Sequence, residues 1–156
     1  MENMSTDPSY VAAQTGLTVG TMLTEQPLEP LLAAAKAEVI TPAMGAVVTF
    51  EGIVRDHDGG RPDVTLLTYT AHPSAPEKLR EIVDEVAGQH PVRLWSAHRT
   101  GDLQVGDLAF TVVAASAHRG DAFRAADACA DRVKAEVPIW KEQSHGDGSV
   151  NWVGLE

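Results

Sequence analysis

The sequence predicts an α+β fold, a mixed or antiparallel sheet with helices packed on it, and two observations support this class. Segments with helical spacing of apolar residues alternate with short runs rich in β-branched and aromatic residues, in the order β-α-β-β-α-β-β-α-β. Strand pairs that interleave with single helices favour this class over a doubly wound parallel sheet. The 156 residues, 44% of them hydrophobic, suffice for one domain with a sizeable core.

The beginning of the chain, residues 1–16, is polar and small and shows no period, which predicts a disordered leader. Residues 17–156 are then expected to form a single domain, because no repeat, low-complexity tract or linker divides them. The start has neither a basic n-region nor an apolar h-region, so no secretory signal is expected.

Three helices are predicted where apolar residues recur at spacings of three and four. They cover about 27–38, 75–87 and 121–137. Ser74 and Glu77 match a capping box at the start of the second helix, and Gly88 stands where a C-cap glycine is expected. Pro138 ends the third helix, because proline cannot continue helical hydrogen bonding.

Six strands are predicted from runs rich in β-branched and aromatic residues. They cover 18–25, 45–54, 64–70, 92–98, 108–115 and 149–153. Between the fourth and fifth of them, Gly101-Asp102 and Gly106-Asp107 bracket a short segment, which indicates turns.

Charge and cysteine content exclude several classes of protein. Twelve basic and 22 acidic residues give a net charge of −10, which argues against a surface for nucleic acid or for anionic membranes. No apolar run approaches the roughly 20 residues of a membrane helix. The single cysteine, Cys129, cannot form an internal disulfide, which favours a reducing compartment, and we expect a soluble cytoplasmic protein.

Basic residues gather in the last third of the chain, and one group lies where a strand leads into the third helix. His118 and Arg119 stand at that helix N-terminus, where free N–H groups and the helix dipole favour an anion. The alternative is a plain helix cap with a solvated Arg119.

A second basic group flanks the break at Pro138. Lys134 and Lys141 lie on either side of Ile139-Trp140, and a lysine partly desolvated beside such a kink acquires a lower pKa that suits catalysis. The alternative is an exposed lysine at a helix end, where it favours the helix dipole.

Arg55 opens a glycine-rich loop, residues 56–62, and such loops at strand ends often carry ligand contacts. The alternative is a solvated hairpin tip in which Arg55 pairs with Asp56 or Asp58. The six histidines show no metal-ligand spacing, so no metal site is expected. Cys129 falls near the apolar stripe of a predicted helix, which is typical of an inert packing residue. Serine hydrolase, P-loop and dinucleotide-binding signatures are also absent from the sequence.

Four ordered motifs together resemble a known family. They are Gly45–Asp56 (GAVVTFEGIVRD), His98–Gly101 (HRTG), Ser116–Arg119 (SAHR), and Lys134 with Pro138–Lys141 (PIWK). This set is similar to the large, catalytic subunit of molybdopterin synthase, the MoaE family, over about residues 18–154.

The resemblance implies an α/β hammerhead fold and a homodimer at the centre of a heterotetramer. Each large subunit would bind a small ubiquitin-like partner of the MoaD type, whose Gly-Gly C-terminus carries a thiocarboxylate. The implied activity is a sulfurtransferase reaction of molybdenum cofactor biosynthesis. It adds two sulfurs to cyclic pyranopterin monophosphate to form the molybdopterin dithiolene, and no cofactor is expected.

The resemblance also implies roles for residues of this chain. Lys134 and Lys141 correspond to the family's two active-site lysines and are the expected catalytic residues. The expected substrate-binding residues are Ile53, Val54, Arg55, His118, Arg119, Lys134, Lys141, Glu142 and Gln143. Arginine and histidine suit the phosphate of the substrate, and the lysines can stabilise developing negative charge or transfer a proton.

Two features of the sequence qualify this assignment. Gln143 occupies a position where the family usually has an acid, and residues 67–73 carry threonines where acids are common. A non-catalytic binding or scaffold subunit for the small partner is therefore the alternative function, although both lysines are retained.

Helix length leads to a further hypothesis about the site. If the third helix is straight, Arg119 and Lys134 lie about 22 Å apart at 1.5 Å per residue, too far to contact one small ligand. We therefore expect a site shared across the dimer. His118 and Arg119 of one protomer would face Lys134 and Lys141 of the other.

Overall fold

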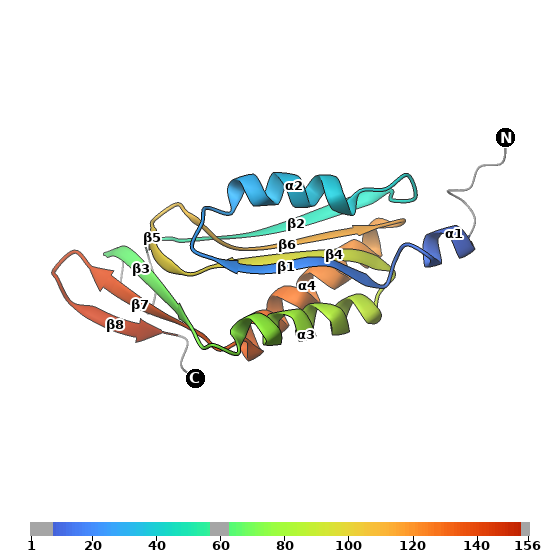
Figure 1. Cartoon of the computed structure of the whole chain (residues 1–156). Helices are drawn as coiled ribbons and strands as arrows, with labels where there is room; N and C mark the ends of the chain where they lie inside the picture. Colours follow the sequence, from blue (N-terminus) through green and yellow to red (C-terminus); the bar gives the residue numbers. More distant parts are fainter. Residues whose placement is uncertain (1–7, 57–62, 154–156) are drawn as a thin grey trace.

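The computed structural model describes residues 8–56 and 63–153, which form four helices and two four-stranded sheets (Figure 1). The helices are α1 (Pro8–Ala12), α2 (Glu29–Val39), α3 (Ala75–Gly88) and α4 (Arg119–Glu136). The strands are β1 (Leu17–Thr24), β2 (Ala46–Ile53), β3 (Val64–Ala71), β4 (Val92–Arg99), β5 (Gly101–Gln104), β6 (Leu108–Ser116), β7 (Ile139–His145) and β8 (Val150–Val153). This architecture confirms the predicted α+β class.

The first sheet, with strand order β1-β4-β6-β2, is covered by helices on both faces (Figure 1). β1 runs parallel to β4, whereas the β4–β6 and β6–β2 pairs are antiparallel. α3 and α4 pack on one face and α2 packs on the other. All nine residues of β6 are buried, as expected of an inner strand with helices on both sides.

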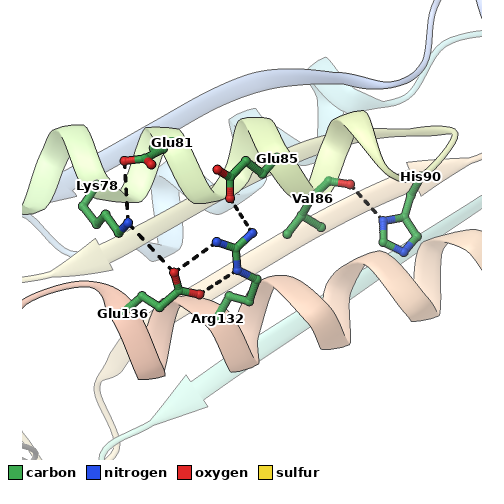
Figure 2. A network of polar contacts seen from close by, with 7 residues as sticks. All are labelled: Lys78, Glu81, Glu85, Val86, His90, Arg132 and Glu136. Carbon is green, nitrogen blue, oxygen red and sulfur yellow. Dashed lines mark hydrogen bonds and ion pairs between the residues drawn. The ribbon is translucent and has the colours of Figure 1, made fainter.

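α3 and α4 lie side by side and are joined at their solvent side by ion pairs (Figure 2). Arg132 of α4 contacts Glu85 of α3 at 2.6 Å and Glu136 of its own helix at 2.7 Å. Lys78 of α3 approaches Glu136 at 3.9 Å. The apolar faces of both helices meet the sheet, and Cys129 lies buried among them, as its position near the apolar stripe predicts.

The second sheet, with strand order β5-β3-β7-β8, is antiparallel throughout and forms an arm beyond the end of the first sheet (Figure 1). A small core joins the two sheets. It consists of Val54, Val64, Leu67, Leu103 and Ala109. This junction is the part of the fold that positions the candidate site.

Some segments differ from the sequence expectation. Ile139–His145, for which no strand was predicted, forms β7 because it pairs with β3 on one side and β8 on the other. Gly101–Gln104, expected only as a segment between turns, pairs with β3 as β5. Within the expected disordered leader, Pro8–Ala12 form α1, and Gly16 N–H binds the Val92 carbonyl at 2.8 Å. Residues 1–7 of that leader lie outside the described residues.

Two predicted helix-end signals are wrong. The Ser74 side chain makes no capping bond to α3, because its hydroxyl instead contacts Nδ1 of His72 at 2.8 Å. Gly88 is the last residue of α3 itself, and the C-cap is Gln89, with φ −95° in the right-handed region. The N-terminus of α3 is therefore formed without a capping box, and its C-terminus without a C-cap glycine.

Among the described residues, no helix is long and apolar enough to cross a membrane.

Candidate active site

A cavity of about 410 Å³ is lined by residues of both sheets, where the arm meets the first sheet. Its walls come from the end of β2, from β3, β4 and β6, from the last turn of α4 and from β7. The expected site residues that line it are Ile53, Val54, Arg55, Lys134 and Lys141. The structure thus brings five of the expected residues together although they lie far apart in the sequence.

Lys134 reaches the cavity because it lies in the last turn of α4, which ends at Glu136. The last turn is closed by the Val137 N–H, which donates to the Val133 carbonyl at 3.1 Å, and Pro138 prevents a further turn. Val133 and Val137 are buried and line the same cavity, so they hold the last turn against it.

Lys141 reaches the cavity through strand alternation. Side chains two residues apart in a strand share a face, so Ile139 and Lys141 both point to the cavity side of β7. Pro138 therefore connects two elements whose ends each supply one lysine. Sequence spacing placed both lysines near a break but did not reveal the strand that directs the second.

Arg55 follows the end of β2, where backbone hydrogen bonds fix the chain. The Val54 N–H donates to the Asp107 carbonyl at 2.9 Å, and the Gly106 N–H donates to the Val54 carbonyl at 2.7 Å. Within residues 8–56 and 63–153, neither Arg55 nor Lys134 forms an ion pair, so the pairing of Arg55 with Asp56 is not observed. Asp58 and the rest of the loop at 57–62 lie outside the described residues. Cations without compensating carboxylates suit an anionic ligand.

His98 of β4 is a cavity residue that sequence reasoning did not single out as a site. Its ring stacks on Phe110 with centroids 5.4 Å apart and forms a T-shaped contact with Tyr69, with centroids 4.9 Å apart. Burial lowers the pKa of His98 to about 4, a hydrogen bond with the Arg99 backbone raises it, and Lys134 and Lys141 lower it further. The ring is therefore neutral near pH 7. The only available sequence signal was its place in the HRTG motif.

His118 and Arg119 lie at the opposite end of α4 and do not line this cavity. α4 has 18 residues and is about 27 Å long at 1.5 Å per residue. His118 lines a second cavity of about 900 Å³, together with α1 and the segments 42–45 and 88–91. A single chain thus does not bring His118 and Arg119 together with the two lysines.

Glu142 and Gln143 follow Lys141 in β7 but do not line the cavity in the described part of the chain. Alternation places Gln143 on the same face as Lys141 and Glu142 on the opposite face. Gln143 is fully buried, and neither polar atom of its amide has a hydrogen-bond partner among the described residues. Leaving such a group unpaired costs stability.

Clusters of at least three His, Cys, Asp or Glu residues that could hold a metal ion are not found among the described residues.

Comparison with known proteins decides the family. The family model described as "MoaE protein" matches residues 23–136 of this chain. The chain belongs to the MoaE family.

Curated members of the MoaE family support this assignment over most of the chain. The molybdopterin synthase catalytic subunit 1 of Mycobacterium tuberculosis is 43% identical over 141 residues, covering 85% of this chain and 88% of the relative. The molybdopterin synthase catalytic subunit of Staphylococcus carnosus is 40% identical over 117 residues, covering 74% and 77%.

Solved structures of the MoaE family share the fold. Molybdopterin synthase from Staphylococcus aureus has a TM-score of 0.75 and 33% identity, covering 83% of this chain and 93% of that chain. A protein–protein complex of subunits 1 and 2 of molybdopterin-converting factor from Helicobacter pylori has a TM-score of 0.68 and 21% identity, covering 88% and 90%. The fold expected from the resemblance is therefore confirmed.

The four MoaE-like motifs of the sequence fall into two places in the structure. Three of them supply residues of the cavity, namely Ile53 to Arg55, His98, and Lys134 with Ile139 and Lys141. The fourth, Ser116–Arg119, ends β6 and begins α4 at the far end of the molecule.

Proposed function

We propose that this MoaE-family chain is the catalytic subunit of a molybdopterin synthase. It would transfer sulfur from the thiocarboxylated Gly-Gly C-terminus of a small ubiquitin-like partner to cyclic pyranopterin monophosphate. The observation that carries the proposal is the cavity at the junction of the two sheets, where Lys134, Lys141 and Arg55 meet. The thiocarboxylate of the partner and the phosphate of the pterin are both anionic, and the three cations can bind such groups.

Each cation has a distinct part in the proposed reaction. Lys134 and Lys141 hold the thiocarboxylate and stabilise the negative charge that develops when sulfur attacks, or transfer a proton as the cyclic phosphate opens. Arg55 contacts the phosphate, for which a planar guanidinium is well suited. Ile53 and Val54 form the adjoining wall, and Ile53 is 51% exposed, which fits a residue at the mouth.

The sulfur comes from the partner in this proposal. Cys129 is buried, and burial raises the pKa of its thiol to about 12, so it is not a sulfur-carrying thiolate. The similar Helicobacter pylori structure is a complex of two subunits of molybdopterin-converting factor, which is consistent with a small-subunit partner here. We place the protein in the cytoplasm, where its single thiol stays reduced.

The site is completed by a second copy of the chain. His118 and Arg119 lie at the far end of α4 from Lys134 in the same chain, so they would contact the substrate only in the partner protomer's cavity. Residues 17–156 act in this proposal as one catalytic domain at the centre of a heterotetramer. Glu142 and Gln143 belong to the proposed substrate-binding set only as neighbours of Lys141 in β7, because neither lines the cavity in the described part of the chain.

The decisive experiment supplies the purified chain with the thiocarboxylated small partner and the cyclic monophosphate and measures dithiolene formation. Lys134→Ala and Lys141→Ala should lower turnover on the order of 10²–10³-fold while partner binding persists, because they remove electrostatic stabilisation. Lys36→Ala is the matched control, since Lys36 is exposed on α2 outside the cavity. Partner binding without product from the unaltered chain would support the scaffold alternative and overturn this proposal.

A further inference from the structure

His98 differs in kind from the other polar groups of the cavity. Lys134, Lys141 and Arg55 are cationic donors, whereas His98 is a neutral ring fixed between two aromatic neighbours. Its position is set by the sheet, because His98 of β4 lies directly opposite Phe110 of β6 in the antiparallel ladder. The rings of these two residues stack with an interplanar angle of 22°, and Tyr69 forms a T-shaped contact with His98 at an interplanar angle of 74°. Its orientation is therefore determined before any ligand enters.

The tautomer of His98 follows from its backbone contact. Nδ1 lies 2.7 Å from the carbonyl oxygen of Arg99, and a carbonyl can only accept, so Nδ1 carries the hydrogen and donates it. Nε2 then carries a lone pair. In the part of the chain that the structure describes, no group pairs with Nε2. Phe110 stacks on the ring, Tyr69 contacts it in a T-shaped arrangement and Nδ1 is occupied, so Nε2 is the ring atom left to pair with a ligand in the cavity that His98 lines.

Nε2 of His98 could act either as a hydrogen-bond acceptor or as a base that takes up a proton, and the charge of the ring decides between these roles. A pKa near 4, lowered mainly by burial, leaves His98 unprotonated at neutral pH, and a base that weak accepts protons poorly. The titratable groups that share the cavity with the ring are Tyr69, Arg55, Lys134 and Lys141, and the charges of Lys134 and Lys141 lower the pKa of His98. They disfavour a positive imidazole. A stable hydrogen-bond acceptor is therefore favoured over a proton carrier.

We propose that His98 binds substrate through a hydrogen bond that Nε2 accepts from an N–H group of the molecule held beside Lys134 and Lys141. This inference rests on the proposed function. The lysines and Arg55 attract the anionic groups, and His98 orients the same ligand through its donor. Both a pterin ring and the amides of a peptide tail carry such N–H groups, so the two substrates are tested separately.

The first test is spectroscopic and does not depend on turnover. Long-range ¹H–¹⁵N correlation of the full chain should show His98 as the Nδ1–H tautomer, neutral from pH 8 to about 5. Addition of the cyclic monophosphate, or of the thiocarboxylated partner, should shift the Nε2 resonance in the direction of hydrogen bonding. A doubly protonated or Nε2–H ring at pH 7, or an Nε2 signal unmoved by both substrates, overturns the proposal.

The second test is kinetic and uses matched variants. His98→Asn keeps an N–H near the position of Nδ1 but has no atom at Nε2, and it should raise the KM of one substrate about tenfold, more than it lowers kcat. His98→Gln places an accepting oxygen near Nε2 and should recover part of that loss. The substrate whose KM changes identifies the donor.

His90→Asn is the control, because His90 also contacts a backbone carbonyl through Nδ1, that of Val86 at 2.9 Å, and does not line this cavity (Figure 2). If the unaltered chain forms no product, the proposed function fails and the spectroscopic test still judges His98. If the unaltered chain is active and His98→Asn behaves like His90→Asn, only the role of His98 fails. If His98→Asn does not fold, His98→Gln and the spectroscopic test decide.

Discussion

Tyr69 of β3 lies directly opposite Lys141 of β7 in the antiparallel ladder, and both residues line the cavity. Opposite residues of such a pair place their side chains on the same face of the sheet. Tyr69 also packs against His98 of the first sheet. The Tyr69–Lys141 pair of the arm is therefore in contact with the first sheet at the cavity. A slip of one residue in the β3–β7 register would turn Lys141 to the opposite face. The arm therefore belongs to the site as much as to the fold.

Complementation between protomers tests the shared site. Coexpression of an Arg119→Ala chain with a Lys134→Ala chain should give mixed dimers that contain one intact site, because the two residues would serve different cavities. With random mixing, activity should recover to about a quarter of the level of the unaltered protein. Coexpression of Lys134→Ala with Lys141→Ala is the control and should recover nothing. Equal failure of both mixtures would contradict a site that Arg119 and Lys134 complete from different protomers.

Replacement of Gln143 tests whether its buried amide lacks hydrogen-bond partners. Gln143→Met has a similar volume and removes two polar atoms that find no partner in the structure, so unfolding free energy should stay equal or rise by about 1 kcal/mol. Urea denaturation measures it, and Gln104→Met, at an exposed position of β5, is the control. A clear loss of stability would show that the amide is paired. Retained turnover would remove Gln143 from the proposed substrate-binding set.

Cys129 should not react with thiol reagents in the folded protein. Burial raises the pKa of its thiol to about 12, although a hydrogen bond with Ser96 opposes this, so the thiolate is scarce at neutral pH. Iodoacetamide should label Cys129 only after unfolding, as mass spectrometry can follow. Cys129→Ala should keep sulfur transfer within about twofold and cost about 1 kcal/mol in packing. Rapid labelling of the native chain, or loss of sulfur transfer, would contradict this.

The ion pairs between α3 and α4 should contribute to stability in a pH-dependent way (Figure 2). Arg132 holds the pKa of Glu136 below its ordinary value of 4.5 through hydrogen bonding. A carboxylate with a lowered pKa stabilises the fold above its ordinary value, and this contribution disappears as the pH falls through the lowered pKa. Arg132→Met should therefore lower Tm at pH 7 by about 2 °C and have a progressively smaller effect as the pH falls below 4.5.

The control for this effect is Arg80→Met. Arg80 pairs with Asp84 on the exposed side of α3 alone, and therefore does not connect the two helices. Its replacement should change Tm less than that of Arg132 at pH 7. An Arg132→Met effect that persists undiminished at pH 3 would indicate lost packing of the side chain rather than a lost ion pair.

The sequence predicted the framework well where its signals are local. Helical spacing located α2, α3 and α4 to within about two residues, and β-branched runs located β1, β2, β3, β4, β6 and β8. It failed for β7, whose residues IWKEQSH carry few β-forming signals and become a strand only by pairing with β3 and β8. Local helix-end signals at Ser74 and Gly88 also misled, because His72 and the continuing helix overrode them.

The sequence by itself determined the α+β class and, through four ordered motifs, the family, and it put forward the two lysines as candidate catalytic residues. Only the tertiary structure decided which of the candidate residues share a cavity. Lys134 and Lys141 meet Arg55 because one ends a helix and the other begins a strand that pairs in the second sheet, whereas the rigid length of α4 separates them from Arg119. His98 became a candidate for the same reason, since the burial that lowers its pKa arises from contacts between strands distant in the sequence, whereas the hydrogen bond that fixes its tautomer is local, to the carbonyl of Arg99.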